Sequence, residues 1–317
     1  MIGYGDVGEP QFLTVLGECE HSLLRGKRAA GGDAKSKIHR RIIRVLRPVR
    51  IALNSKLKIL FVPKHTLTFT ALDGIGEIMP GQLIAEIIID AIAGNALSLG
   101  DNHVVVLCQK IVSKAENRYV ELATVRASPR AKELAVQCAK DPRLVELVLR
   151  ESSAVLRCVK DVLIVRHRLG FIVANAGIDQ SNIPDAAARA LLLPHDPDDS
   201  AAAIRTMLAQ RLGVRVGVII SDSFGRPWRM GVCGTAIGCA GLNPLIDLRG
   251  KSDRFGRALR VTQVAVADEI AASATLIMGE ADEGRPIVLV SGVSEEYFSE
   301  NGSATQLLRP AAQDLFL

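Results

Sequence analysis

The stretch Val218-Ile-Ile-Ser-Asp-Ser-Phe-Gly-Arg-Pro-Trp-Arg229 carries most of the information about the fold and the function of this chain. Its β-branched start, residues 218–220, predicts a buried strand. The polar cluster of residues 221–223 predicts that the strand ends there and that a loop opens to solvent. Carboxylate and hydroxyl oxygens suit Mg²⁺ or Mn²⁺, and guanidinium groups suit phosphoryl oxygens. The stretch therefore indicates either a metal and phosphate site or a polar turn after a core strand.

A second polar segment, Asn175-Ala-Gly-Ile-Asp-Gln-Ser-Asn-Ile-Pro184, follows a short predicted strand at residues 171–173. Asp179 and Asn182 are three residues apart and can present oxygens to a single ion or phosphate. The alternative is a turn, because Asn, Asp and Ser form local hydrogen bonds that favour turns. Together with Asp222 after another strand, Asp179 supports the hypothesis of a metal site with paired carboxylates.

The remaining patterns mix strands and helices without a regular β-α-β alternation, and no internal repeat is present. This mixture predicts an α+β fold, a two-lobed combination of mixed sheet and helices, in place of a doubly wound nucleotide fold. Helices are expected at residues 83–92, 128–140, 142–150, 199–212 and 264–278, and strands at 57–62, 104–107, 162–165, 171–173, 214–220 and 286–290.

Two common nucleotide-binding motifs are excluded. Gly250-Lys251-Ser252 resembles part of a P-loop, but Leu245 stands where that motif needs its first glycine. No Rossmann glycine fingerprint follows a predicted strand either. A nucleotide would therefore bind to a fold that is neither P-loop nor Rossmann.

Composition narrows the class of protein. Apolar residues make up 48% of the chain and predict a globular core, whereas aromatic residues make up only 4%, which disfavours stacking on single-stranded nucleic acid. No apolar run reaches the roughly 18 residues of a membrane span. The six cysteines include no C-x-x-C pair and are expected to be free thiols. We therefore expect a cytoplasmic protein with neither a membrane span nor a nucleic-acid partner.

The net charge of +5 is unevenly distributed. Residues 21–58 hold twelve Lys or Arg residues against one acid, so they carry +11 and the remainder carries −6. Residues 1–56 are predicted to be a disordered basic extension, and residues 57–317 the folded domain. The alternative is a short basic amphipathic helix at residues 38–49 that binds an acidic membrane or nucleic acid.

Seven segments, taken in order, resemble the coenzyme F420-0:L-glutamate ligase (F420 γ-glutamyl ligase) family over about residues 58–293. The matching segments are Gly74-Ile-Gly-Glu-Ile-Met-Pro-Gly81, Gln109-Lys-Ile-Val-Ser-Lys-Ala-Glu116, Ala174-Asn-Ala-Gly-Ile-Asp-Gln-Ser-Asn-Ile183, Leu191-Leu-Leu-Pro-His-Asp-Pro197, Ser221-Asp-Ser-Phe-Gly-Arg-Pro-Trp-Arg229, Asp253-Arg-Phe-Gly-Arg-Ala-Leu259, and Ala267-Asp-Glu-Ile-Ala-Ala272 with Met278-Gly-Glu280.

The resemblance implies a GTP-dependent ligase that adds L-glutamate to coenzyme F420-0 through an acyl phosphate, in F420 biosynthesis. It also implies a two-lobed homodimer and two divalent ions, Mg²⁺ or Mn²⁺, at the GTP phosphates, with K⁺ as a further candidate ion. Carried over by motif, Asp179 and Asp222 match ligands of one metal, and Ser223 matches a ligand of the second. The residues that match nucleotide contacts are Ile75, Gly76, Glu77, Ile78, Gln109, Lys114 and Asn182.

Arg226 and Arg229 are assigned to catalysis on chemical grounds, because two guanidinium groups could clamp the polyanionic substrate or the glutamate carboxylates. The chain departs from the family where Gly81-Gln82-Leu83 replaces a usual Gly-Asp-Asp, and where Gln109 replaces a frequent Ser. Two alternatives therefore remain: a related nucleotide-dependent amide ligase that acts on another carboxylate, and a non-catalytic protein that binds through its basic tail.

Overall fold

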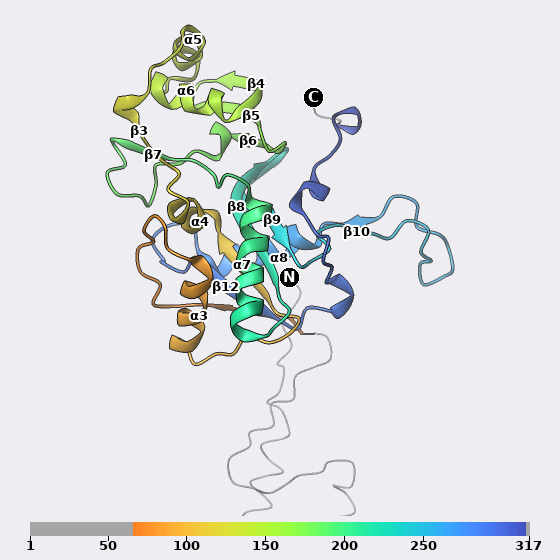
Figure 1. Ribbon diagram of the computed structural model, residues 1–317. Helices are drawn as coiled ribbons and strands as arrows, with labels where there is room; N and C mark the ends of the chain where they lie inside the picture. The colour runs from red at the N-terminus through yellow and green to blue at the C-terminus, as the bar shows by residue number, and fades with distance from the viewer. Residues whose placement is uncertain (1–65, 315–317) are drawn as a thin grey trace, which may run out of the picture. The chain divides into compact units, whose positions relative to one another are not determined.

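The computed structural model describes residues 66–314 (Figure 1). The expected extension at residues 1–56 and the expected strand at residues 57–62 lie outside this part. The described part combines four separate sheets with helices, which confirms the predicted α+β class. Within it, no helix is both long enough and apolar enough to cross a membrane.

A five-stranded sheet forms the centre of the fold. Only β2 and β8 run parallel in it; the other neighbouring pairs are antiparallel. The order of its strands is β1 (Thr68–Ala71), β12 (Ile287–Ser291), β2 (Val104–Cys108), β8 (Gly217–Arg226) and β9 (Arg229–Ala240).

Helices cover both faces of this sheet, and the strands alternate accordingly. In β2, Val105 and Leu107 pack with α3 (Ile84–Gly94), α4 (Gln109–Ala115) and α7 (Pro197–Leu212). Val104 and Val106 point the other way and pack with α8 (Val266–Met278). Because both faces are buried, β2 is continuously apolar, as is usual for a central strand.

A smaller unit of helices and strands follows α4 and has a core of its own, and Figure 1 shows its elements grouped together. Ser128 and Asp141 cap its two helices, accepting hydrogen bonds from the N–H groups of Ala131 and Arg143 at 3.2 and 2.8 Å. The unit comprises α5 (Pro129–Cys138), α6 (Pro142–Arg150) and the sheet of β4 (Ser152–Val159), β5 (Val162–His167) and β6 (Ile172–Ala174).

Short elements complete the described part. They are β3 (Tyr119–Glu121) paired with β7 (Arg189–Leu191), β10 (Ile246–Asp247) paired with β11 (Gln263–Val264), and the 3₁₀ turns η2 (Leu122–Thr124), η3 (Asn175–Gly177), η4 (Glu295–Tyr297), η5 (Ala304–Leu307) and η6 (Ala311–Gln313).

The five expected helices correspond to α3, α5, α6, α7 and α8, and the expected strands at residues 162–165 and 171–173 are the paired strands β5 and β6. The structure also contains strands that the sequence pattern did not predict, and the longest of them is β9. Its interior glycines Gly234 and Gly238 lower its strand propensity. A Cβ atom at Gly234 would lie 2.0 Å from Thr275 Oγ1, and one at Gly238 would lie 2.3 Å from the carbonyl oxygen of Pro197. These glycines therefore let α8 and α7 pack closely against β9.

The expected end of the strand at Ser221 was wrong. β8 continues to Arg226 because β9 pairs with it along its whole length, up to the pair Arg226–Arg229. Its other neighbour, β2, ends at Cys108, directly opposite Ser221, where the chain turns into α4. Asp222 therefore lies within a strand, at the point where that strand loses one of its two neighbours.

Candidate functional site

A cavity of about 680 Å³ lies where β2 and β8 part. Five segments far apart in the sequence line it: the loop at residues 75–78, α4, the connection at residues 179–184, β8, and the loop at residues 279–286. Of the site residues predicted from the sequence, this cavity brings together Ile75, Gly76, Glu77, Ile78, Lys114, Asp179, Asn182, Asp222 and Ser223.

The location follows from the topology. Because β2 and β8 are parallel, their carboxyl ends meet at the same edge of the sheet, and Cys108 pairs with Ser221 there. Ligands of open sheets commonly bind at such an edge. α4 begins directly after β2, so that Lys110 and Lys114, one helical turn apart, both reach the cavity.

The carboxyl group of Asp222 is unusually reluctant to ionise. Its pKa is raised from 3.8 to about 7, mainly by burial and in smaller part by the negative charges of Asp179 and Glu280. The N–H of Ser223 and the charge of Lys110 act in the opposite direction but do not outweigh burial. A cation bound in this cavity would therefore stabilise the ionised form of Asp222.

Asp179 is held in the ionised state. Burial alone would raise its pKa, but the hydrogen bond and charge of Lys110 and the N–H of Ser181 outweigh this and lower it. Lys110 Nζ lies 2.7 Å from Asp179 Oδ2, and the N–H of Ser181 lies 2.7 Å from Oδ1. Reciprocal backbone hydrogen bonds with Leu191, of 3.0 and 2.9 Å, fix the position of Asp179.

Two contacts join the loops of the predicted nucleotide site. Lys114 is nearly buried, and its Nζ lies 2.6 Å from Oε1 of the exposed Glu77. Asn182 Nδ2 donates a hydrogen bond of 2.8 Å to the carbonyl oxygen of Ala281. The first contact ties the loop at residues 75–78 to α4, and the second links the connection at residues 179–184 to the loop at residues 279–286.

Glu280 is a site residue that the sequence reasoning did not assign. The hydroxyl of Ser223 lies 2.7 and 2.8 Å from its two carboxylate oxygens. Glu280 was part of a matched segment, but it lies 57 residues from Ser223 and nothing local indicated their contact. Lys110 was also left without a role, although its spacing from Lys114 was a usable signal.

The donors of this site fit a hard divalent cation. Asp179, Asp222, Ser223 and Glu280 offer only oxygen atoms, which Mg²⁺ and Mn²⁺ prefer. Among residues 66–314, no three or more His, Cys, Asp or Glu side chains already converge on one point as a metal-binding group. Binding of a cation would therefore require Asp179 and Glu280 to exchange their present contacts with Lys110 and Ser223.

Three predicted site residues do not line the cavity. Gln109 is buried, and its Oε1 accepts a hydrogen bond of 2.8 Å from Ser113 Oγ. Arg226 and Arg229 are exposed at the end of the β8–β9 hairpin, where Arg226 Nη2 donates to the carbonyl oxygen of Met230 at 3.2 Å. Arg226 lies four residues beyond Asp222 along the strand, a distance of roughly 13 Å. The roles assigned to these residues remain predictions.

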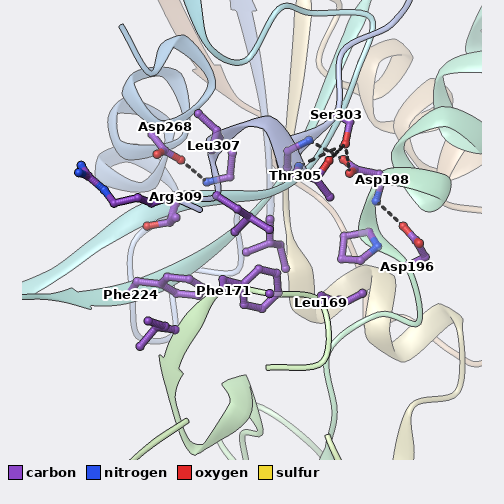
Figure 2. Close-up of a pocket in the computed structure, with 18 of the residues that line it drawn as sticks. Leu169, Phe171, Asp196, Asp198, Phe224, Asp268, Ser303, Thr305, Leu307 and Arg309 are labelled. Carbon is purple, nitrogen blue, oxygen red and sulfur yellow. Dashed lines mark hydrogen bonds between the residues drawn. The ribbon is translucent and has the colours of Figure 1, made fainter. Parts of the chain in front are cut away.

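A second cavity, of about 470 Å³, lies beside β9 (Figure 2). Two of its carboxylates bind the backbone of β9. Asp198 Oδ1 accepts hydrogen bonds from the N–H groups of Cys239 and Ala304 at 2.7 and 2.8 Å, and Asp268 Oδ1 accepts one from the N–H of Ala236 at 2.9 Å. The contacts of these two carboxylates in this cavity are therefore structural ones.

Comparison with known proteins relates the chain to one family of ligases. The sequence profile of the F420-0:γ-glutamyl ligase family matches residues 74–292. The chain is 42% identical over 250 residues to the coenzyme F420:L-glutamate ligase of Methanothermobacter thermautotrophicus, a match that covers 79% of this chain and 98% of that protein. It is 41% identical over 242 residues to the protein of that name from Methanopyrus kandleri, covering 76% and 93%, respectively. It is 39% identical over 251 residues to the one from Haloarcula marismortui, covering 77% and 93%.

Proposed function

Since the chain belongs to the F420-0:γ-glutamyl ligase family, we propose that it joins L-glutamate to coenzyme F420-0 at the expense of GTP, in the cytoplasm. One observation carries this proposal. Nine of the residues that match metal and nucleotide ligands of the family line a single cavity of about 680 Å³, although they come from segments up to 148 positions apart, from Ile75 to Ser223.

The chemistry requires activation of a carboxylate, which does not react with an amine at neutral pH. The terminal carboxylate of F420-0 attacks the γ-phosphorus of GTP, the bond to the β-γ bridging oxygen breaks, and GDP leaves. The amine of glutamate then attacks the acyl carbon and loses a proton, phosphate departs, and an amide remains. Phosphoryl transfer depends mainly on alignment and charge neutralisation, and a cavity lined with cations and acidic ligands can supply both.

The residues of the chain divide this work. Asp179 and Asp222 would hold one divalent ion, and Ser223 with Glu280 would contribute to a second. Such ions, when bound, neutralise the charge of the phosphates. Lys114 would hold phosphate oxygens, because its nearly buried ammonium group reaches the cavity. Asn182 and the loop at residues 75–78 would orient the nucleotide beside them.

One departure supports a second candidate, a related ligase that acts on another carboxylate. Four residues after the loop at residues 75–78, Gln82 replaces an acid that is usual in the family. Its Oε1 accepts a hydrogen bond of 2.7 Å from the N–H of Met79 and so closes the turn. A neutral residue in this place removes a negative charge from the turn that follows the loop at residues 75–78, while the turn itself stays closed.

We also propose that the protein acts as a homodimer. Large apolar side chains are exposed at the end of the β8–β9 hairpin and on the segment between β10 and β11, which extends away from the central sheet in Figure 1. Trp228 and Met230 are 88% and 94% exposed, and Phe255 is 94% exposed. Exposed apolar groups of this kind favour association with a second copy.

The decisive test is GTP turnover with F420-0 and L-glutamate in the presence of Mg²⁺ or Mn²⁺, with mass spectrometry of the product. A glutamyl adduct that forms only with GTP and metal supports the proposal, and no adduct under either metal refutes it. Activity with other carboxylates in place of F420-0 would favour the second candidate. A chain that lacks residues 1–56 should retain ligase activity, whereas a protein that binds through its basic tail would lose its function.

A further inference from the structure

Lys110 lies at the centre of the acidic groups of the cavity. Its Nζ is 2.7 Å from Asp179 Oδ2 and 2.6 Å from Ser181 Oγ. Ser181 Oγ in turn lies 3.0 Å from the same Asp179 oxygen. The lysine thus binds an oxygen that the proposed function assigns to a metal ion.

The environment strengthens this contact. The side chain of Lys110 is only 20% exposed and that of Asp179 37%, so that solvent screens their attraction less than it would at an open surface. Asp222 also lies within the range of the Lys110 charge. By contrast, Lys114, one turn further along α4, is paired with Glu77 of the loop at residues 75–78. The two lysines of α4 therefore form ion pairs with different carboxylates.

An ammonium group and a divalent cation compete for the lone pairs of one carboxylate oxygen, and they also repel each other. On the basis of the proposed function, we infer that Lys110 is an internal competitor of the metal ion at Asp179, which makes metal binding depend on the nucleotide. The phosphates of a nucleotide offer Lys110 another anionic partner within the same cavity. Binding of the nucleotide then releases Asp179 for the metal.

Lys110 is thus a positioning residue that sets the order of binding. Without nucleotide, Lys110 stays paired with the ionised carboxylate of Asp179. The site then binds divalent ions weakly. With nucleotide, the positive charge of Lys110 faces phosphate, and the carboxylate is free. This order prevents the site from holding a metal ion before a phosphate is present to share it.

The test measures Mn²⁺ binding to the full chain by electron paramagnetic resonance, which reports free Mn²⁺, without nucleotide and with a non-hydrolysable GTP analogue. Lys110→Gln should bind Mn²⁺ about tenfold more tightly than wild type without nucleotide, since a unit charge this close changes the cation affinity of a carboxylate by at least that factor. The difference should shrink with the analogue. Lys110→Arg, which retains the charge, should match wild type, and so should Lys132→Gln, which removes an exposed lysine from α5.

Equal or weaker Mn²⁺ binding by Lys110→Gln without nucleotide, with its circular dichroism unchanged, would overturn the inference. If the Mn²⁺ affinity of Lys110→Gln exceeded that of wild type by the same factor with and without the analogue, the inference would also be overturned. The nucleotide would then not relieve the competition between Lys110 and the metal ion. The ligase assay of the wild type decides the proposed function separately. A protein that makes the glutamyl adduct but shows no effect of Lys110 on Mn²⁺ affinity retains the function and loses only this inference.

Discussion

The hydroxyl of Ser223 lies within hydrogen-bond distance of both carboxylate oxygens of Glu280, at 2.7 and 2.8 Å. This contact joins β8 to the loop that follows α8, on the opposite side of the sheet from α4. It gives the cavity a second oxygen-rich corner, apart from the one that Asp179 and Lys110 form. Each corner provides its own carboxylate, which is the arrangement that the two proposed metal ions would need.

If Glu280 holds a metal ion, its charge matters more than its shape. Glu280→Gln keeps the size and the ability to contact Ser223 but removes the charge, and it should lower kcat at least about a hundredfold, on the scale of a lost electrostatic contact to the transition state. The measurement is initial-rate GTP turnover with F420-0 and glutamate. Glu133→Gln, on the exposed face of α5, is the matched control and should turn over GTP as wild type does. Equal rates for the two variants would exclude a catalytic role for Glu280.

Lys114 should contribute to nucleotide affinity. Lys114→Gln removes a nearly buried cation from the cavity and should raise the KM for GTP about tenfold or more, because hydrogen bonds to charged groups contribute about 1.5–3 kcal/mol. Glu77→Gln should have a smaller effect, since the Glu77 side chain is 53% exposed. Steady-state kinetics at varied GTP concentration measure both effects. An unchanged KM in Lys114→Gln would show that this lysine only anchors the loop at residues 75–78.

The pH dependence of the free energy of unfolding should show the protonation of the Asp222 carboxyl group. Burial, together with the negative charges of Asp179 and Glu280, raises its pKa from 3.8 to about 7. Between these values, the folded protein holds a proton that the unfolded chain releases. The free energy of unfolding therefore falls as the pH rises from about 4 to about 7, and remains lower above that range.

Asp222→Asn removes this penalty and should be more stable than wild type at pH 8, by up to about 4 kcal/mol, while the difference should nearly vanish at pH 4. Urea unfolding in the presence of a chelator, at both pH values, measures this difference. The exposed Asp90→Asn on α3 serves as the control. A stability difference that does not change with pH would contradict the assignment.

The close packing of α8 on β9 predicts a steric effect. A Cβ atom at Gly234 would lie 2.0 Å from Thr275 Oγ1 and 2.6 Å from the carbonyl oxygen of Ala271. Gly234→Ala should therefore destabilise the fold by about 3 kcal/mol or more, since neither β9 nor the helix backbone can move freely. At Gly225, in the same hairpin, a Cβ would meet nothing within 4 Å, and Gly225→Ala should change stability by less than about 1 kcal/mol. Thermal unfolding of both variants tests the contrast, and equal losses would refute it.

Local signals in the sequence predicted the elements that local interactions determine. Helices were expected from residues 128 and 142, and Ser128 and Asp141 cap helices there, because a cap acts within three residues. The continuation of β8 past Ser221 could not be predicted in this way. It depends on pairing with β9, and the glycines of β9 weaken its strand signal. Those glycines allow close packing against α7 and α8, which lie elsewhere in the sequence.

The same division holds for the site. The segment motifs predicted Asp179, Asp222 and Lys114, and these residues meet in one cavity. Their partners come from pairings that the sequence does not encode locally: Lys110 contacts Asp179 across 69 positions, and Ser223 contacts Glu280 across 57. Gln109 illustrates the reverse case, because its place at the start of α4 turns the side chain into the core, although the residues on either side of it reach the cavity.

The carboxylates beside β9 have a consequence for association. β9 is the last strand of the five-stranded sheet, and an unpaired strand edge invites pairing with a strand of another molecule, which leads to aggregation. Asp198 and Asp268 accept hydrogen bonds from the N–H groups of Cys239 and Ala236, two donors that an incoming strand would need. Negative charge at this margin also repels the carbonyl oxygens of any such strand. The β9 edge of the main sheet thus resists uncontrolled growth into fibrils, although apolar side chains are exposed near the end of the same strand.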